Sequence, residues 1–207
     1  MMRFVTIALC VIALQSFASC SFDEESTNEY DESAIIQRRE DIDEMFRNSD
    51  QSPIKSEDKD AFKGLQYFAP SEEYAILASF DAYENPDTVQ LATSKAGEKR
   101  AMLKYGTFSF QSPDGSSCTL TAYKYLDIDV ETLFIPFKDK SNGFTTYETG
   151  RYLEVDESAS SEEYLLDFNK AYNPYCAYNA EYSCPLIPAE NILKTTIAAG
   201  EKKPAEK

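Results

Sequence analysis

Residues 74–110 read YAILASFDAYENPDTVQLATSKAGEKRAMLKYGTFSF, and this stretch decides the fold. Apolar and polar residues alternate through most of it, and a period of two is typical of β-strands. The pattern predicts strands over 74–83, 88–94 and 98–110. Lys95-Ala96-Gly97 is typical of a tight turn, so we expect the last two strands to form a hairpin.

Gly106 interrupts the alternation in the third of these strands. Leu103 and Tyr105 precede it, whereas Phe108 and Phe110 follow it with the opposite parity. Glycine inside a strand often marks a bulge. A bulge or bend at Gly106 would turn large apolar residues from both halves of the strand toward the core.

The rest of the chain adds one helix and more strands. Residues 31–48 carry an apolar stripe at helical spacing behind a capping residue, Asp31 or Ser33. The stripe comprises Ile35, Ile36, Ile42, Met45 and Phe46. Further strands are predicted over 118–126, 132–137, 151–156, 164–168 and 194–199. Helices and strands do not alternate regularly, so we expect a mainly β, α+β fold: an antiparallel β-barrel or sandwich of about eight strands with an N-terminal helix.

The first twenty residues, MMRFVTIALCVIALQSFASC, resemble the leader of a bacterial lipoprotein. The apolar run is too short to span a bilayer and ends in small residues before Cys20. We therefore expect a lipoprotein signal peptide over 1–19, lipidation (palmitate) at Cys20, a flexible acidic tether over 20–31, a single globular domain over 32–201 and a disordered tail over 202–207. The alternative is a plain secreted protein with a cysteine near its cleavage site.

These features predict a location in the cell envelope. An acyl chain on Cys20 would make the membrane a partner through hydrocarbon burial. Acidic residues after that cysteine, Asp23-Glu24-Glu25, resemble export signals of surface lipoproteins. We expect the outer membrane of a Gram-negative bacterium, on its surface or its periplasmic face.

The charge and the missing histidine exclude several functions. The chain has 36 acidic and 20 basic residues, a net charge of −16. Such a surface repels phosphate backbones, so we expect no nucleic-acid partner. With no histidine, Ser-His-Asp and Cys-His catalysis are excluded. No glycine-rich phosphate loop occurs, and we expect no cofactor.

Two cysteines enclose seven residues near the C-terminus, Cys176 and Cys184. In an exported protein, cysteines at this spacing can form a disulfide, and the alternative is two separate buried thiols. Cys118 is predicted to be a buried apolar residue on a strand. Three scattered cysteines without histidine are a poor ligand set, so we expect no metal site.

A polar set flanks the last predicted strands and enters the loop that follows. Its members are Arg151, Glu154, Asp167, Asn169 and Asn173. Arg151 is expected to pair with Asp167 or Glu154, because buried charges need partners. The set is consistent with a structural network, with ligand binding, or with acid and base roles for two carboxylates in unlike surroundings.

Several strings resemble a bacterial family, domain of unknown function family 1684. They are YETGRYL (147–153), LDFNKAYNP (166–174), Cys176-Ala177, Cys184-Pro185, Asn191 and Ala199-Gly200-Glu201, preceded by Gly64-Leu65, Tyr67-Phe68, Tyr105-Gly106 and LFIPFKD (133–139). The resemblance spans about residues 35 to 201. It implies a family membership without an established activity, cofactor or partner.

The sequence leaves two hypotheses about function. The first is a small-molecule-binding or structural module of the cell envelope, in which residues 169–185 shape a polar-rimmed cleft. The alternative is a carboxylate-dependent hydrolase that uses Asp167 or Glu154 as its acid or base and Arg151 to bind an anion.

Overall fold

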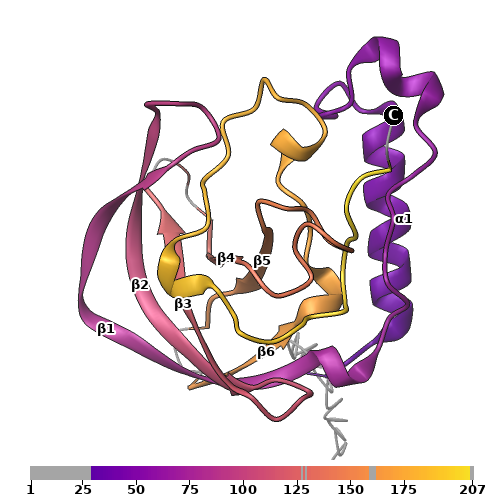
Figure 1. Cartoon of the computed structure of the whole chain (residues 1–207). Helices are drawn as coiled ribbons and strands as arrows, with labels where there is room; N and C mark the ends of the chain where they lie inside the picture. Colours follow the sequence, from indigo (N-terminus) through magenta and orange to yellow (C-terminus); the bar gives the residue numbers. More distant parts are fainter. Residues whose placement is uncertain (1–28, 127, 129, 159–161, 206–207) are drawn as a thin grey trace, which may run out of the picture.

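Six antiparallel strands form one sheet that curls into a nearly closed barrel (Figure 1). This computed structural model describes residues 29–126, 128, 130–158 and 162–205. The strands are β1 (Ala75–Ala92), β2 (Lys99–Gln111), β3 (Ser117–Tyr125), β4 (Thr132–Phe137), β5 (Arg151–Asp156) and β6 (Glu163–Asp167). Their order is β5-β4-β3-β2-β1-β6, and the two edge strands, β5 and β6, approach each other. The predicted class, a mainly antiparallel β fold with an N-terminal helix, is confirmed.

The interior of the barrel is filled by side chains from every strand. Examples in strand order are Ala78, Phe108, Leu120, Ile135, Leu153 and Leu166. Burial of each large side chain contributes roughly 1.5–3 kcal/mol. The alternation of buried and exposed positions in the sequence therefore decides which face of each strand turns inward.

The hairpin predicted at Lys95-Ala96-Gly97 is present, with Gly97 at φ +83°. The two strands predicted before this turn, over 74–83 and 88–94, are wrong as separate elements, because a single strand, β1, runs through both from Ala75 to Ala92. That strand stays paired with β2 but changes register between Ala82 and Asp87. The intervening Pro86 has no backbone N–H to donate to the ladder, which accounts for an irregularity that resembles a strand end in the sequence.

The irregularity predicted at Gly106 is also present. The register between β2 and β3 shifts between Lys104 and Gly106. A Cβ atom at this position would lie 2.5 Å from the Phe80 ring and 2.7 Å from the Asp81 carbonyl oxygen. Only glycine fits there, because the Phe80 ring and the Asp81 carbonyl of the neighbouring strand β1 occupy the space a side chain would need.

The last predicted strand, over 194–199, does not form. Just before this segment, the Asn191 side chain hydrogen-bonds to the Thr121 backbone and to the Pro136 carbonyl. The carbonyls of Ile197 and Ala199 accept from the buried Arg151 side chain instead of from a neighbouring strand. Six strands therefore replace the eight expected. Two predicted strands are continuous in β1, and the segment over 194–199 is held by the Arg151 side chain and forms no strand.

Helix α1 (Glu32–Asn48) covers loops on one side of the barrel (Figure 1). Asp31 caps it as predicted, by accepting from the backbone N–H groups of Ser33 and Ala34. Ile35 and Phe46 are buried, whereas Ile36 is 43% exposed, so the expected apolar stripe is wrong at that position.

Short helices complete the fold. They are η1 (Ser56–Ala61), η2 (Glu72–Tyr74), η3 (Phe168–Lys170), η4 (Tyr175–Ala177) and η5 (Ala189–Asn191). None of the helices in the described ranges is long and apolar enough to cross a membrane.

Candidate functional site

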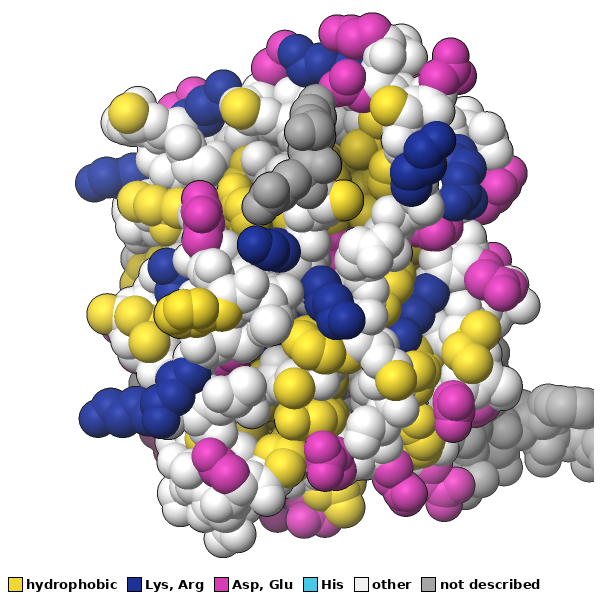
Figure 2. Space-filling view, turned by 45° about the vertical axis from the view of Figure 1, so that its right-hand side comes forward, with side chains coloured by type: hydrophobic (Ala, Val, Ile, Leu, Met, Phe, Trp, Pro, Cys, Tyr) yellow, Lys and Arg dark blue, Asp and Glu magenta, His cyan; other side chains and the backbone are white. Residues whose placement is uncertain are grey.

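A cavity of about 490 Å³ lies between α1, one end of the barrel and the loop over 172–185. Figure 2, with the α1 side brought forward, shows hydrophobic side chains between Lys and Arg side chains on this face. Most of the lining is aromatic or apolar, and the aromatic members are Phe46, Tyr67, Tyr125, Tyr152, Tyr172, Tyr175 and Tyr182. Ile42 and Met45 from α1 add aliphatic surface.

Ring-to-ring contacts hold these aromatic walls in place. Tyr152 and Tyr172 meet edge to face at 5.7 Å between ring centroids, and Tyr175 and Tyr182 meet similarly at 5.3 Å. Phe46 of α1 contacts Tyr175 at 6.0 Å. Each such pair contributes about 0.5–1.5 kcal/mol beyond burial. The walls of the cavity are therefore pre-formed by packing between the helix and the loop.

Glu154, on β5, contributes a carboxylate to the cavity. It is half-buried and accepts a hydrogen bond from the Tyr172 hydroxyl at 2.9 Å. Burial, together with this carboxylate, raises the pKa of Tyr172 well above its ordinary value, so the phenol stays protonated. Glu154 also lines a second cavity, of about 590 Å³, between β5 and β6.

Glu201 and Asn173 form a buried polar pair at the same cavity. Glu201 is only 2% exposed, and its Oε2 accepts from the backbone N–H of Asn173 at 2.8 Å. Its Oε1 and the Asn173 Oδ1 have no hydrogen-bond partner within the described part of the chain. Burial raises the pKa of Glu201 to about 8, so this carboxyl group is mostly protonated at neutral pH.

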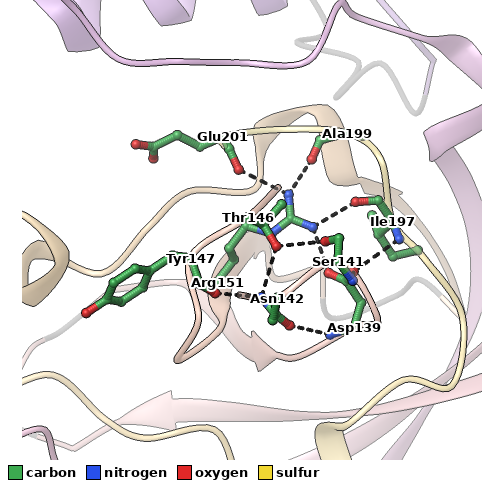
Figure 3. A network of polar contacts seen from close by, with 9 residues as sticks. All are labelled: Asp139, Ser141, Asn142, Thr146, Tyr147, Arg151, Ile197, Ala199 and Glu201. Atoms are coloured by element: carbon green, nitrogen blue, oxygen red, sulfur yellow. Dashed lines mark hydrogen bonds and ion pairs between the residues drawn. The ribbon is translucent and has the colours of Figure 1, made fainter. Parts of the chain in front are cut away.

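Arg151 is the centre of a separate, closed network (Figure 3). Its Nη2 lies 2.8 Å from Asp139 Oδ2, and both side chains are 0% exposed. The guanidinium also donates to the carbonyls of Ile197, Ala199 and Glu201. The pairing expected with Asp167 or Glu154 is thus wrong, because the partner is Asp139, on the loop after β4.

This network holds the loop after β4 against the C-terminal segment. Asp139 Oδ1 accepts from the backbone N–H of Ser141 at 2.7 Å, and the Ser141 and Thr146 hydroxyls are 2.7 Å apart. Figure 3 shows the Glu201 carboxyl group pointing away from Arg151, while its backbone carbonyl points toward it. Arg151 therefore joins two segments that are distant in sequence.

Asp167 and Asn169 also make structural contacts. Asp167 accepts from the backbone and side-chain N–H groups of Asn169, and Lys170 lies 3.6 Å away. Asn169 exchanges two hydrogen bonds with the Ser71 backbone. Asp167 lines the second cavity, together with Glu154, whereas Asn169 and Arg151 line neither of the two.

The structure thus brings two of the five predicted residues, Glu154 and Asn173, to the first cavity. The tyrosine walls and two arginines, Arg38 and Arg100, were missed. The density of tyrosine over 172–182 was the available signal for the walls. Nothing local in the sequence connects Arg38 on α1 with Arg100 on β2.

Cys176 and Cys184 lie next to each other as free thiols. The Cys176 backbone N–H is 3.3 Å from the Cys184 sulfur. A hydrogen bond from the Cys184 thiol lowers the pKa of Cys176 to about 6.

Cys118 is buried on β3, as predicted. In the described ranges, no group of three or more Cys, Asp or Glu side chains is placed to hold a metal ion.

Fold and cavity together define a small antiparallel β-barrel protein with a helix, α1, packed beside the barrel. Residues 60–202 match the family described as "Protein of unknown function (DUF1684)", and the chain belongs to that family. A solution NMR structure of an uncharacterized protein from Haloarcula marismortui is similar, with 38% sequence identity, a TM-score of 0.66, and coverage of 83% of this chain and 93% of that one. No curated protein matches the chain.

Proposed function

We propose that this protein is a small-molecule-binding module that takes its ligand in the cavity between α1 and the loop over 172–185. The observation that carries the proposal is the cavity itself. Its volume of about 490 Å³ lies within the range of ligand sites, roughly 300–1,000 Å³. Ligand sites are typically apolar and aromatic with a few convergent polar groups, and the tyrosine walls with Glu154 and Asn173 fit that description.

The hydrolase alternative receives less support from the same geometry. Its anion-binding group, Arg151, is 0% exposed and bonded to Asp139 and to backbone carbonyls. Its candidate acid or base, Asp167, accepts hydrogen bonds from Asn169. Of Arg151, Asp167 and Glu154, only Glu154 lines the tyrosine-walled cavity. The hydrolase would need all the groups of its mechanism in one site, whereas ligand binding does not.

A thermal-shift screen with a blocked variant tests the binding proposal. Met45→Trp places a bulky ring at the half-buried α1 position that lines the cavity, and Glu40→Trp adds the same ring on the exposed side of α1. A ligand at a hundred times its Kd stabilises the native state by about 2.7 kcal/mol. Compounds that raise the Tm of the wild type should raise that of Glu40→Trp but not that of Met45→Trp.

Two results would contradict this proposal. One is a screen in which no compound raises the Tm of the wild type. The other is a set of stabilising compounds that act equally on Met45→Trp and Glu40→Trp, because such compounds bind elsewhere.

We further propose that the module is held in the cell envelope, at the outer membrane, by acyl chains on Cys20. That cysteine lies outside the described residues, and the proposal is supported by the leader-like sequence before it. Each buried CH₂ of an acyl chain contributes about 0.8 kcal/mol to membrane binding.

Cys20→Ser should move the protein from the membrane pellet to the soluble fraction when cells are lysed and centrifuged. Cys10→Ser, a change within the leader, should leave the protein in the pellet. Equal membrane retention of Cys20→Ser and the wild type would refute the anchor.

A further inference from the structure

The arginines of the described residues fall into two groups. The first group has partners. Arg39 donates to two backbone carbonyls, and Arg47 pairs with Asp43. Arg151 pairs with Asp139 and donates to three carbonyls. Arg38 and Arg100 make no hydrogen bond and no ion pair with any described residue, and both line the tyrosine-walled cavity. Among the five arginines that the structure describes, these two therefore have guanidinium donors that no described residue engages.

The two guanidinium groups come from different walls of the cavity. Arg38 is an exposed residue of α1, and its charge acts on Tyr67. Arg100 is a half-buried residue of β2, and its charge acts on Tyr152 and on Cys184. The tyrosine walls therefore have one cation on the helix side and one on the barrel side.

The lining of the cavity also contains two carboxyl groups, those of Glu154 and Glu201. Glu154 is engaged by the Tyr172 hydroxyl. Burial raises the pKa of Glu201 to about 8, so this group carries little negative charge at pH 7. The lining thus holds two guanidinium groups beside the Glu154 carboxylate, on a protein whose net charge is −16.

We propose, as an extension of the binding function on which this inference rests, that the ligand is an organic acid. Its anionic head lies between Arg38 and Arg100, and its aromatic or other flat apolar body lies against the tyrosine walls. Arginine suits this role because its planar fork donates two parallel hydrogen bonds to a carboxylate or a phosphate. The half-buried position of Arg100 strengthens its attraction for an anion relative to open water.

The walls match such a body chemically. The Tyr152 hydroxyl donates to the Pro185 carbonyl at 2.6 Å, and the Tyr172 hydroxyl donates to Glu154. Both polar ends are therefore engaged by the protein, and the rings are left to contact the ligand. Flat apolar groups pack well against edge-to-face aromatic pairs of this kind.

Matched probes separate charge recognition from simple apolar binding. We would measure the Kd of 3-phenylpropionate, 3-phenylpropionamide and 3-phenylpropan-1-amine by protein-observed NMR at low salt. The carboxylate should bind at least tenfold more tightly than the amide. Arg38→Gln and Arg100→Gln should each reduce carboxylate affinity toward that of the amide.

Control variants remove a positive charge outside the cavity. Arg47→Gln lies on the same helix as Arg38, and Lys99→Gln precedes Arg100 on β2; neither residue lines the cavity. Both should bind the carboxylate as the wild type does. The Tm of unliganded Arg38→Gln and Arg100→Gln should be close to that of the wild type, because neither change removes a hydrogen bond or an ion pair to a residue that the structure describes.

The outcomes distinguish this inference from the binding function beneath it. If the amide or the amine binds as tightly as the carboxylate, or if an Arg38→Gln/Arg100→Gln double variant keeps full carboxylate affinity, the organic-acid assignment is wrong and the binding module stands. If none of the three probes shifts resonances of the cavity residues and the thermal-shift screen is also empty, both fail.

Discussion

Replacing Arg151 by methionine should lower the free energy of unfolding by roughly 3–5 kcal/mol. The change leaves the Asp139 carboxylate buried without its countercharge, and it removes the donor from the carbonyls of Ile197, Ala199 and Glu201. Methionine has a similar length and fills much of the space, so the loss reports the charge and the hydrogen bonds. Urea unfolding followed by circular dichroism measures it.

Two further variants identify the cause of that loss. Arg151→Met combined with Asp139→Leu removes the stranded charge but not the unpaired carbonyls, so it should recover only part of the stability. Arg47→Met breaks an exposed ion pair with Asp43 and should cost only about 0.5 kcal/mol. An Arg151→Met protein as stable as Arg47→Met would show that the buried network does not hold the fold together.

Glu201→Gln should remove a pH dependence of stability that the wild type shows between about pH 5 and pH 8. Burial raises the pKa of this carboxyl group from 4.5 to about 8 in the native state. Over that interval the native protein keeps the proton and the unfolded chain releases it. Wild-type stability therefore falls as pH rises, by at most roughly 1.4 kcal/mol per pH unit from this group.

Glutamine stays neutral and preserves an oxygen for the Asn173 N–H, so the stability advantage of the variant should grow with pH and level off above about pH 8. Urea unfolding at a series of pH values measures the difference. Glu181→Gln is the control: this exposed carboxylate has its pKa lowered by the hydrogen bond from Lys55, so its removal should give no such growing advantage. A constant difference between Glu201→Gln and the wild type would mean that Glu201 is ionised in the native state at neutral pH.

Local signals in the sequence predicted the elements that depend on local physics. Asp31 caps α1 because its side chain reaches the free N–H groups of its own first turn. The strands over 132–137 and 151–156 were predicted at their observed bounds, because their apolar residues form short runs that end at charged or turn residues. The bend at Gly106 is predictable because most of the apolar residues before this glycine in β2 are at odd positions and those after it are at even positions.

The errors have non-local causes. Residues 194–199 alternate like a strand, but the carbonyls of Ile197 and Ala199 are taken by Arg151, which lies far earlier in the chain. The partner of Arg151 was mistaken for the same reason: Asp139 precedes it by a loop that folds back on itself. Spacing along the chain carries no information about such a contact.

The sequence by itself determined the class of fold, the helix that begins at Glu32, the hairpin at Gly97, the bend at Gly106 and the family, because alternation, capping and turn chemistry act between near neighbours. Only the tertiary structure decided the cavity and its charge. Arg38 and Arg100 face one space because the helix docks on loops while the sheet curls, and Glu201 keeps its proton because packing around it excludes water. Burial and electrostatics depend on distance through space, and it is the curled sheet that sets those distances.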